Sequence, residues 1–445
     1  MNPARLLLGA ALALGLSGCQ PSAPVAPVAG AASEPAPAWS YDDERRRSEA
    51  AVSEARAALA RGPVAWPQWE TLARAQLALA QLSGDYRLYT AAEQSLQQAF
   101  DLAGAGSGPF LARARYNYTV HRLDRVAADL DAAERESNPD RAAILGLRAD
   151  LAFQRGDYPA ALTGYRAALE LREDVQGLVR LALWQGHMGH LSEALALMDR
   201  AERIDHGDSP HPRAWLALQR GLLALHRGRW DLALAHYQHA LRLLPGWWLA
   251  REHVAEIHAL QGQTELALQE YAAVIGDTGS PEFMDASARL LRERGDAAAA
   301  APWIARARAL YEERLAQLPE ATYGHGLDHY LQFGSPAEAL ALARRNQALR
   351  PNGEASIKLA AALLNAGQPA EALRWLRQTL DSGWRSAELH ATAARAAAAN
   401  GELAEAREQA RLAKALNPKS GHQYGLPELP PPVSTAALAT QRGGE

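Results

Sequence analysis

The stretch "LLALHRGRWDLALAHYQHALRLLPGWW", Leu222 to Trp248, decides the fold of this chain. It contains three histidines, His226, His236 and His239, and it closes on a Pro-Gly pair followed by two tryptophans. Two interpretations compete: a metal or cofactor site made of histidines, or one helical hairpin of a repeated scaffold. Whether the stretch recurs along the chain distinguishes them.

The pattern of this stretch recurs along the chain. A turn glycine is followed by a large residue two positions later, alanine at five, a bulky residue at nine and most often alanine at twelve. Successive turn glycines are separated by 33, 39, 34, 33, 39, 33 and 34 residues. They are Gly156, Gly189, Gly228, Gly262, Gly295, Gly334, Gly367 and Gly401. A register of this kind indicates stacked units of one shape.

The recurring unit resembles the tetratricopeptide repeat (TPR), a helix-turn-helix of 34 residues with small residues at fixed positions. In the clearest copy, Ala233 and Ala240 let the helices approach closely, Trp230 and Tyr237 fill the space between them, and Pro245 ends the second helix. The resemblance implies an all-α fold, a right-handed superhelical solenoid.

Eight clear units cover residues 142–418, and weaker hairpins over residues 41–141 add two or three degenerate ones. The upstream segment has no turn glycine between His121 and Asp124, where a turn is expected. The two 39-residue steps contain extra residues, "IDHGDSPHP" and "RLAQLPEATYGHG", which we expect to lengthen a turn or the preceding helix.

The chain begins with a predicted secretory signal over residues 1–18, an arginine followed by the apolar run from Leu6 to Leu16. The end of this segment, Leu-Ser-Gly-Cys, resembles the bacterial lipobox, which implies that Cys19 is lipidated. Gln20 follows it, and the resemblance implies the periplasmic face of a Gram-negative outer membrane.

Residues 19–40 are rich in Pro and Ala and predict an extended tether, and the Pro-rich residues 419–445 predict a disordered tail. Cys19 is the only cysteine, so a disulfide framework is excluded. The net charge of −4 and the pI near 6.4 give no basic face for nucleic acid, and none is expected as a partner.

In the TPR family the first helix of each unit lines a concave groove, which places His226 in the groove and the other two histidines of the opening stretch outside it. A three-histidine site is therefore not expected there. The predicted groove is apolar and aromatic in the middle, then acidic, then basic, with mixed charge upstream. Its candidate residues are Asp150, Arg180, His187, Trp215, Leu218, Leu222, His226, Leu249, Glu252, His253, Glu256, Arg289 and Arg292. Such a surface suits an extended peptide or a partner helix.

Two clusters of ionisable residues within the predicted helices suggest a metal-binding or hydrolytic protein as an alternative to a scaffold. Glu252, His253 and Glu256 could serve acid-base work or hold a metal, or equally form a solvated acidic patch that receives a basic side chain of a peptide. The segment "HGLDHY" gives His325, Asp328 and His329 the spacing of the H-x-x-E-H motif of inverted zincins, with aspartate in place of the catalytic glutamate.

A third alternative is a carrier of glycans or small ligands that stack on Trp215, Trp247 and Trp248. Motifs for nucleotide binding, serine hydrolases and HExxH metalloproteases are missing from the sequence. We therefore expect no enzyme and no cofactor, and a lipid-anchored scaffold that binds a protein or peptide during assembly of an envelope or secretion complex.

Overall fold

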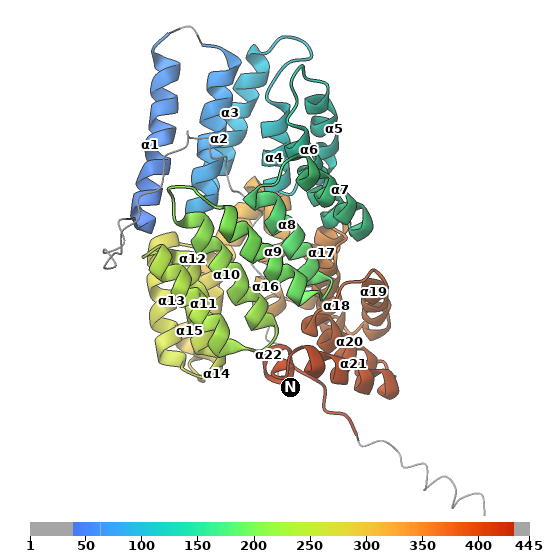
Figure 1. Ribbon diagram of the computed structural model, residues 1–445. Coiled ribbons are helices and arrows are strands. Elements are labelled where there is room, and N and C mark those ends of the chain that lie inside the picture. The colour runs from blue at the N-terminus through green and yellow to red at the C-terminus, as the bar shows by residue number, and fades with distance from the viewer. Residues whose placement is uncertain (1–38, 63, 431–445) are drawn as a thin grey trace, which may run out of the picture.

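The computed structural model describes residues 39–62 and 64–430. Over these residues the chain forms 22 α-helices and no strand (Figure 1). The helices are α1 (Tyr41–Ala60), α2 (Trp66–Ser83), α3 (Tyr86–Leu102), α4 (Phe110–Thr119), α5 (Leu123–Glu134), α6 (Arg141–Gln154), α7 (Tyr158–Leu171), α8 (Val175–His187), α9 (Leu191–Ile204), α10 (His211–His226), α11 (Trp230–Leu243), α12 (Trp248–Leu260), α13 (Thr264–Thr278), α14 (Pro281–Glu293), α15 (Ala297–Gln317), α16 (Pro319–Phe333), α17 (Pro336–Leu349), α18 (Gly353–Asn365), α19 (Pro369–Asp381), α20 (Ala387–Ala399), α21 (Leu403–Leu416) and α22 (Ser420–Tyr424).

Helices α6 to α21 pair into eight antiparallel hairpins, one for each glycine-centred copy, and α2 to α5 form two more. The alanine five residues after each turn glycine exposes at most 1% of its surface. These alanines are Ala161, Ala194, Ala233, Ala267, Ala300, Ala339, Ala372 and Ala406. Small side chains at the contact shorten the distance between helix axes. The predicted all-α solenoid of TPR-like hairpins is confirmed.

Most turns have the predicted backbone. Seven of the eight turn glycines have φ between +69° and +89°, the left-handed region that ends a helix sharply. Gly334 differs, with φ −91°, and here a capping box between Ser335 and Glu338 begins α17. Space requires a glycine here, since a Cβ at Gly334 would lie 2.6 Å from Cδ1 of Tyr330.

The turn between α4 and α5 is made without glycine. His121 takes the left-handed conformation there, with φ +60°, and it is the one non-glycine residue with positive φ in the described chain. Its side chain is buried, and Nη1 of Arg350 lies 3.1 Å from its Nε2. This tertiary contact explains why the turn exists where the sequence shows no turn signal.

The two insertions have different outcomes. The first forms the loop between α9 and α10, from which the Ser209 hydroxyl donates a hydrogen bond of 2.9 Å to the Glu44 carboxylate of α1. The second lengthens α15, which spans 21 residues. Both results match the expectation that extra residues extend a turn or the preceding helix.

The solenoid winds back onto itself, so that its first half rests on its second half. In Figure 1, α1 to α7 lie above α11 to α15 and α17 to α21. Hydrogen bonds join segments about 200 residues apart: Tyr41 N to Pro245 O, Asn352 Nδ2 to Gln154 Oε1, Gly353 N to the Tyr158 hydroxyl, and Arg385 N to His187 O, all within 2.9 Å. We call this contact between consecutive superhelical turns the junction.

The turn glycines show which edge of the solenoid meets the junction. A Cβ at Gly156 would lie 2.6 Å from the Pro351 carbonyl oxygen, and one at Gly228 would lie 2.1 Å from Oδ1 of Asn417. The corresponding position at Gly262 has no atom within 4 Å, and the same holds for Gly295, Gly367 and Gly401. The glycine edge of the first superhelical turn is therefore covered by the second.

Residues after Lys419 contain a short ordered helix, α22, in place of the disorder that we expected from their composition. Its residues Gln423 and Tyr424 are buried, and the Trp230 indole donates to Gln423 Oε1 at 3.4 Å. The Lys419 ammonium lies 3.8 Å above the Trp230 ring. Packing of Tyr424 against Ala387, Ala391 and Ala413 of α20 and α21, together with the contacts to Trp230 of α11, orders this segment. Residues 431–445 lie outside the described chain.

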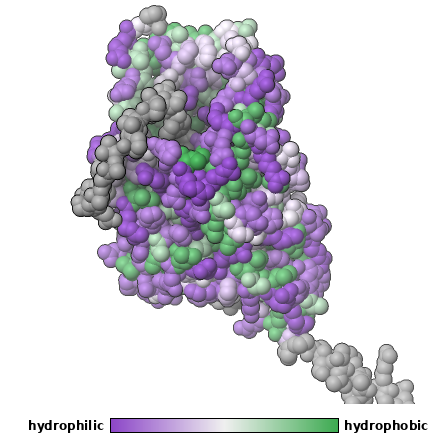
Figure 2. All heavy atoms as spheres, viewed as in Figure 1, coloured by the Kyte–Doolittle hydropathy of each residue, from purple (hydrophilic) through white to green (hydrophobic). Residues whose placement is uncertain are grey.

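The face seen in Figure 2 is mostly hydrophilic, with hydrophobic residues in small groups between charged ones. In the described chain no helix combines the length and the apolar character needed to span a membrane. The predicted signal, Cys19 and nearly all of the tether lie outside the described residues.

Candidate functional site

A cavity of about 130 Å³ lies at the junction, where the α2–α3 and α4–α5 turns face α12, α14 and α16. Its wall combines aromatic and aliphatic side chains with a similar number of polar or charged ones. The lining residues are Gln81, Gly84, Tyr86, Tyr89, Thr119, Val120, His121, Trp248, Leu249, Glu252, Ser280, Glu282, Phe283, Arg314, Ala321 and His325. The cavity exists only because residues from both halves of the chain meet.

Helix starts place the aromatic rings of this cavity. Tyr86 and Tyr89 stand one turn apart at the beginning of α3, with ring centroids 5.7 Å apart in an edge-to-face arrangement. Trp248 begins α12, directly after the turn at Pro245, and its ring lies 5.8 Å from that of Phe283 in α14. The Trp248 indole donates a hydrogen bond of 3.1 Å to the Leu82 carbonyl and so fixes the ring across the junction.

One ion pair forms part of the cavity wall. The Arg314 guanidinium donates to both oxygens of Glu282, at 3.0 and 3.3 Å, and lies 4.0 Å above the Tyr86 ring. Burial alone would raise the pKa of Glu282, but Arg314 holds it below its usual value. His325 Nδ1 lies 3.9 Å from the same carboxylate. The charge of Glu282 is therefore already balanced from within the protein.

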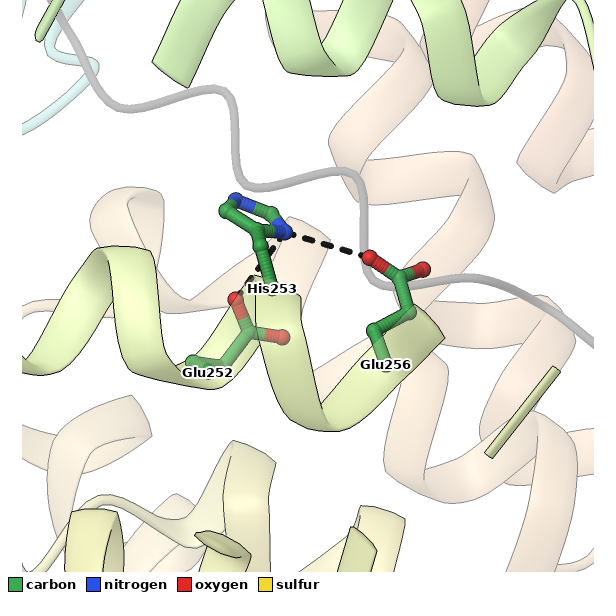
Figure 3. A group of neighbouring side chains, drawn as sticks. All are labelled: Glu252, His253 and Glu256. Atoms are coloured by element: carbon green, nitrogen blue, oxygen red, sulfur yellow. Dashed lines mark hydrogen bonds and ion pairs between the residues drawn. The ribbon is translucent and has the colours of Figure 1, made fainter. Parts of the chain in front are cut away.

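Glu252, at the edge of the cavity, belongs to a buried group of three side chains on α12. Nδ1 of His253 lies 3.1 Å from Oε2 of Glu252 and 3.1 Å from Oε2 of Glu256, as Figure 3 shows. The three residues are only 1 to 4% exposed. The two glutamates are four positions apart and so lie on one face of the helix, and His253 between them reaches both carboxylates. The structure thus brings together the predicted trio, but as a buried cluster and not as a solvated acidic patch.

Burial controls the protonation of this cluster. It raises the pKa of Glu252 to about 7, although the His253 imidazole opposes the increase. For His253 the effect of burial is to lower the pKa, but the two carboxylates outweigh it and raise the pKa above its ordinary value. The Tyr237 ring stacks on this imidazole at 5.0 Å, and its buried hydroxyl has no hydrogen-bond partner. Burial and the neighbouring charges therefore set the protonation of Glu252 and His253 together.

The other predicted chemical cluster does not form. Asp328 pairs with Lys358 at 2.8 Å, and His329 Nδ1 lies 2.8 Å from Oδ1 of Asp285 on the neighbouring α14. His325 faces Glu282 instead. Each of the three side chains thus has a different partner, because residues on neighbouring hairpins lie close enough to pair with it. The hypothesis of a zincin-like site at His325, Asp328 and His329 is wrong for this arrangement.

The apolar middle of the predicted groove is buried in the core. Trp215, Leu218 and Leu249 expose 9% or less of their surface, and Leu222 packs partly buried against the same core cluster. We expected these side chains to face a partner. They pack instead, because the tight winding closes this part of the groove. His226 is exposed, so it alone of the middle group stays accessible.

Three further predicted positions are engaged within the protein. Asp150 is buried and accepts hydrogen bonds from the Tyr165 hydroxyl at 2.9 Å and from Arg180 Nε at 2.8 Å. His187 stacks on Trp384 across the junction, with ring centroids 4.3 Å apart. These side chains stabilise the solenoid; Asp150 is buried, and Arg180 and His187 are partly buried.

The basic end of the predicted groove is only partly free. Arg289 pairs with Glu293 at 3.3 Å, whereas Arg292 is exposed, with its guanidinium 4.9 Å above the Phe333 ring. Trp215, Trp247 and Trp248 are all at least 91% buried, which leaves little ring face for a sugar to stack on. The glycan-carrier alternative therefore loses the feature that suggested it.

Sequence reasoning missed most of the cavity. Tyr86 and Tyr89 follow the turn glycine Gly84, and their spacing of three was a usable signal that both rings lie on one helix face. Phe283 and Arg314 lie about 200 residues further along the chain, and no local pattern links them to the tyrosines. Repeat register places residues within a unit, but it does not reveal which units meet after a full superhelical turn.

No protein-family model and no curated protein matches the sequence. Among solved structures, a tetratricopeptide repeat protein from Parabacteroides merdae is 16% identical, with 54% of this chain and 93% of that one covered and a TM-score of 0.34. A human IFIT1 dimer with PPP-AAAA gives 14% identity, coverage of 84% and 86%, and a TM-score of 0.40. The Cut9–Hcn1 hetero-tetramer of APC/C is 14% identical, with 91% of this chain and 84% of that one covered and a TM-score of 0.39. At these scores nothing about function is carried over to this chain.

Proposed function

We propose that this protein is a scaffold that binds a segment of a partner protein and takes one bulky apolar side chain of that segment into the junction cavity. The cavity is the observation that carries the proposal. A solenoid of helical hairpins offers extended surfaces for such contacts. The groove that we expected along the inner helices is largely packed, which leaves the cavity as the place where a side chain can insert.

The size and the lining of the cavity define the occupant. Its volume is about 130 Å³, and an apolar cavity of about 150 Å³ is known to hold a molecule as large as benzene. Four aromatic rings and three aliphatic side chains line the junction cavity, beside eight polar or charged side chains. One phenyl or branched aliphatic side chain fits this space, whereas a whole helix does not. Burial of such a side chain contributes about 1.5–3 kcal/mol.

The polar side chains of the cavity wall can orient a bound segment. The Gln81 amide donates to the Thr119 hydroxyl at 3.3 Å, and the Arg314–Glu282 pair stands opposite. Hydrogen-bonding groups beside an apolar pocket favour one backbone register of a bound segment over others. We therefore propose binding of an extended segment.

A displayed library of random peptides, panned on the purified chain, tests this proposal. We expect enriched peptides to share one bulky apolar residue and to bind Ala321→Phe at least tenfold more weakly, because the new ring fills the cavity. Ala337→Phe is the matched control, since Ala337 is exposed near the start of α17. Absence of enrichment on the wild-type chain, or equal binding to Ala321→Phe, would contradict the proposal.

We also propose that lipidated Cys19 anchors this scaffold to the periplasmic face of the outer membrane, where it acts as an adaptor in the assembly of an envelope or secretion complex. The support is the Leu-Ser-Gly-Cys sequence directly after an apolar run, with Cys19 as the only cysteine. Labelling of cells with palmitate should mark the wild-type chain and not Cys19→Ser. Equal labelling of both chains would rule out this anchor.

A further inference from the structure

The buried trio on α12 presents three ligand atoms to one point. Oε2 of Glu252, Nδ1 of His253 and Oε2 of Glu256 all lie within 4.8 Å of one another, as Figure 3 shows. We propose that these three side chains bind one divalent transition-metal ion of the zinc type. The inference goes beyond partner binding and does not depend on it, although Glu252 also borders the cavity.

The distances within the trio suit such an ion. Zinc binds carboxylate oxygen and imidazole nitrogen at about 2.0–2.2 Å, so neighbouring ligand atoms lie about 2.9 Å apart at right angles and about 3.4 Å apart in a tetrahedron. The two nitrogen–oxygen separations here are both 3.1 Å, between these two values. The widest separation, between the two carboxylate oxygens, is at most 4.8 Å, slightly more than twice a zinc–oxygen bond of about 2.0–2.2 Å. A small rotation of one glutamate therefore brings all three atoms to one ion, with little movement of the histidine.

The donor set fits a borderline divalent cation. Imidazole nitrogen favours zinc and its neighbours over calcium and magnesium, and two carboxylates supply the charge that neutralises a divalent ion. All three side chains come from one turn of α12, which packs between α11 and α13 and holds them in place. Three protein ligands leave at least one coordination position for water or for a bound partner.

Two unsatisfied polar atoms, one within the trio and one beside it, point to a missing ligand. Oε1 of Glu256 is buried without a hydrogen-bond partner. The Tyr237 hydroxyl, on the ring that stacks against His253, is also buried without a partner, and the tyrosine is fully inaccessible. Leaving a buried polar atom unpaired costs about 1–3 kcal/mol, so two of them next to two carboxylates are unusual in a packed interior.

The His329–Asp285 pair provides the internal comparison. It too is a buried imidazole within 2.8 Å of a carboxylate, but it offers only one carboxylate. A site with two ligands binds zinc far more weakly than one with three. If the trio is the site, removal of one of its carboxylates abolishes tight binding, and removal of His329 does not.

Titration of the untagged full chain with zinc chloride, followed by competition with a chelator of known affinity, tests the inference. We expect one zinc per chain, an affinity at least about 100-fold weaker in Glu256→Gln, and an unchanged affinity in His329→Gln. Circular dichroism checks that both variants are folded. Failure of the wild-type chain to bind zinc, or equal binding by Glu256→Gln, would overturn the inference.

A second measurement needs no variant. X-ray absorption of the zinc-loaded wild-type chain should show a first shell of oxygen and nitrogen with one imidazole. A shell with sulfur, or with two or more imidazoles, would place the ion elsewhere and overturn the inference. Neither measurement involves a peptide, so a failure here is distinguishable from a failure of the proposed partner binding.

Discussion

His121 shows how a single residue can hold a turn that lacks glycine. Its left-handed backbone costs about 1–2 kcal/mol for a residue with a Cβ. Burial lowers the pKa of His121 well below its usual value, and the charge of Arg350 lowers it further, so the ring is neutral. A neutral Nε2 can accept a hydrogen bond from Arg350 across the junction. The contact with Arg350 offsets the backbone strain.

Two substitutions separate the backbone strain from the side-chain contact. His121→Gly and His121→Ala both remove the imidazole, but only glycine also relieves the positive φ. We expect His121→Ala to lower the free energy of unfolding by about 1 kcal/mol more than His121→Gly. Urea denaturation measures the difference. Equal stabilities of the two variants would contradict the left-handed conformation at this residue.

Glu388 gives a residue-scale prediction about pH. Burial raises its pKa to about 7, against the opposing charge of Lys358. The folded state therefore keeps a proton between about pH 4.5 and 7 that the unfolded state has released, so this residue's contribution to stability falls as the pH rises through that window. We expect Glu388→Gln to raise the free energy of unfolding at pH 8 by about 1–3 kcal/mol.

Urea denaturation of wild type and Glu388→Gln at pH 4 and pH 8 checks this. The variants should differ little at pH 4, where both folded states carry a neutral side chain at this position. A stabilisation of the same size at both pH values would show that the charge of the carboxylate is not the cause.

At the scale of elements, the turns between paired helices have a second role at the junction. Gly228 and Gly262 occupy equivalent turns with φ of +69° and +79°. An added Cβ at Gly228 meets Oδ1 of Asn417 at 2.1 Å, whereas at Gly262 it meets nothing within 4 Å. A substitution by alanine causes the same backbone strain at both positions. The difference in stability between the two variants therefore measures the contact of Gly228 with the C-terminal segment that leads into α22.

We expect Gly262→Ala to cost about 1 kcal/mol of stability, from backbone strain alone, and Gly228→Ala to cost a further 1–3 kcal/mol, about the usual penalty of overpacking. Gly228→Ala should also speed tryptic cleavage after Lys419, because the segment that begins with Asn417 must detach and so fits the protease more easily. Limited proteolysis and urea denaturation measure both effects. Similar stability and similar cleavage of the two variants would contradict the docking of this segment.

Contacts within one hairpin could be predicted from the sequence, whereas contacts across the junction could not. Ala233, Tyr237 and the turn glycines follow from a local spacing, so the hairpins and their inner and outer helices could be predicted. Trp384 could not, because it leaves no repeat signal and its partners Tyr158 and His187 lie about 200 residues away. Contacts between superhelical turns depend on the small rotation between each unit and the next, summed over about six units, and a local sequence pattern does not determine that rotation.

For the candidate site, too, helical spacing predicted part of the arrangement, and contacts between units decided the rest. Glu252, His253 and Glu256 lie within five residues of one helix, and their convergence could be predicted from helical spacing. Their burial could not, since it depends on how closely the solenoid winds. His325, Asp328 and His329 had equally suitable spacing, but Lys358 and Asp285 on neighbouring hairpins draw two of them apart. Spacing predicts a shared face, and neighbouring units decide which partners each side chain meets.

At the scale of the whole molecule, the central claim is that consecutive superhelical turns touch. The cavity, the His121 turn and the contacts between the C-terminal segment and Trp230 all depend on it. An open solenoid would keep α1 far from the loop before α12. In this structure the Tyr41 amide donates to the Pro245 carbonyl at 2.9 Å, and a Cβ at Gly246 would lie 3.9 Å from that of Tyr41. This separation is within the range that a disulfide bridges.

The most direct test is therefore a disulfide across the junction. Tyr41→Cys and Gly246→Cys are combined in a Cys19→Ser chain, which has no other cysteine. The control pair is Arg56→Cys with Gly246→Cys, since Arg56 lies on the same helix about 22 Å from Tyr41. After mild oxidation, mass spectrometry of the digested monomer should find the 41–246 bridge in nearly all molecules and the 56–246 bridge in almost none. Failure of the 41–246 pair to form, or equal formation of both bridges, would contradict the closed solenoid.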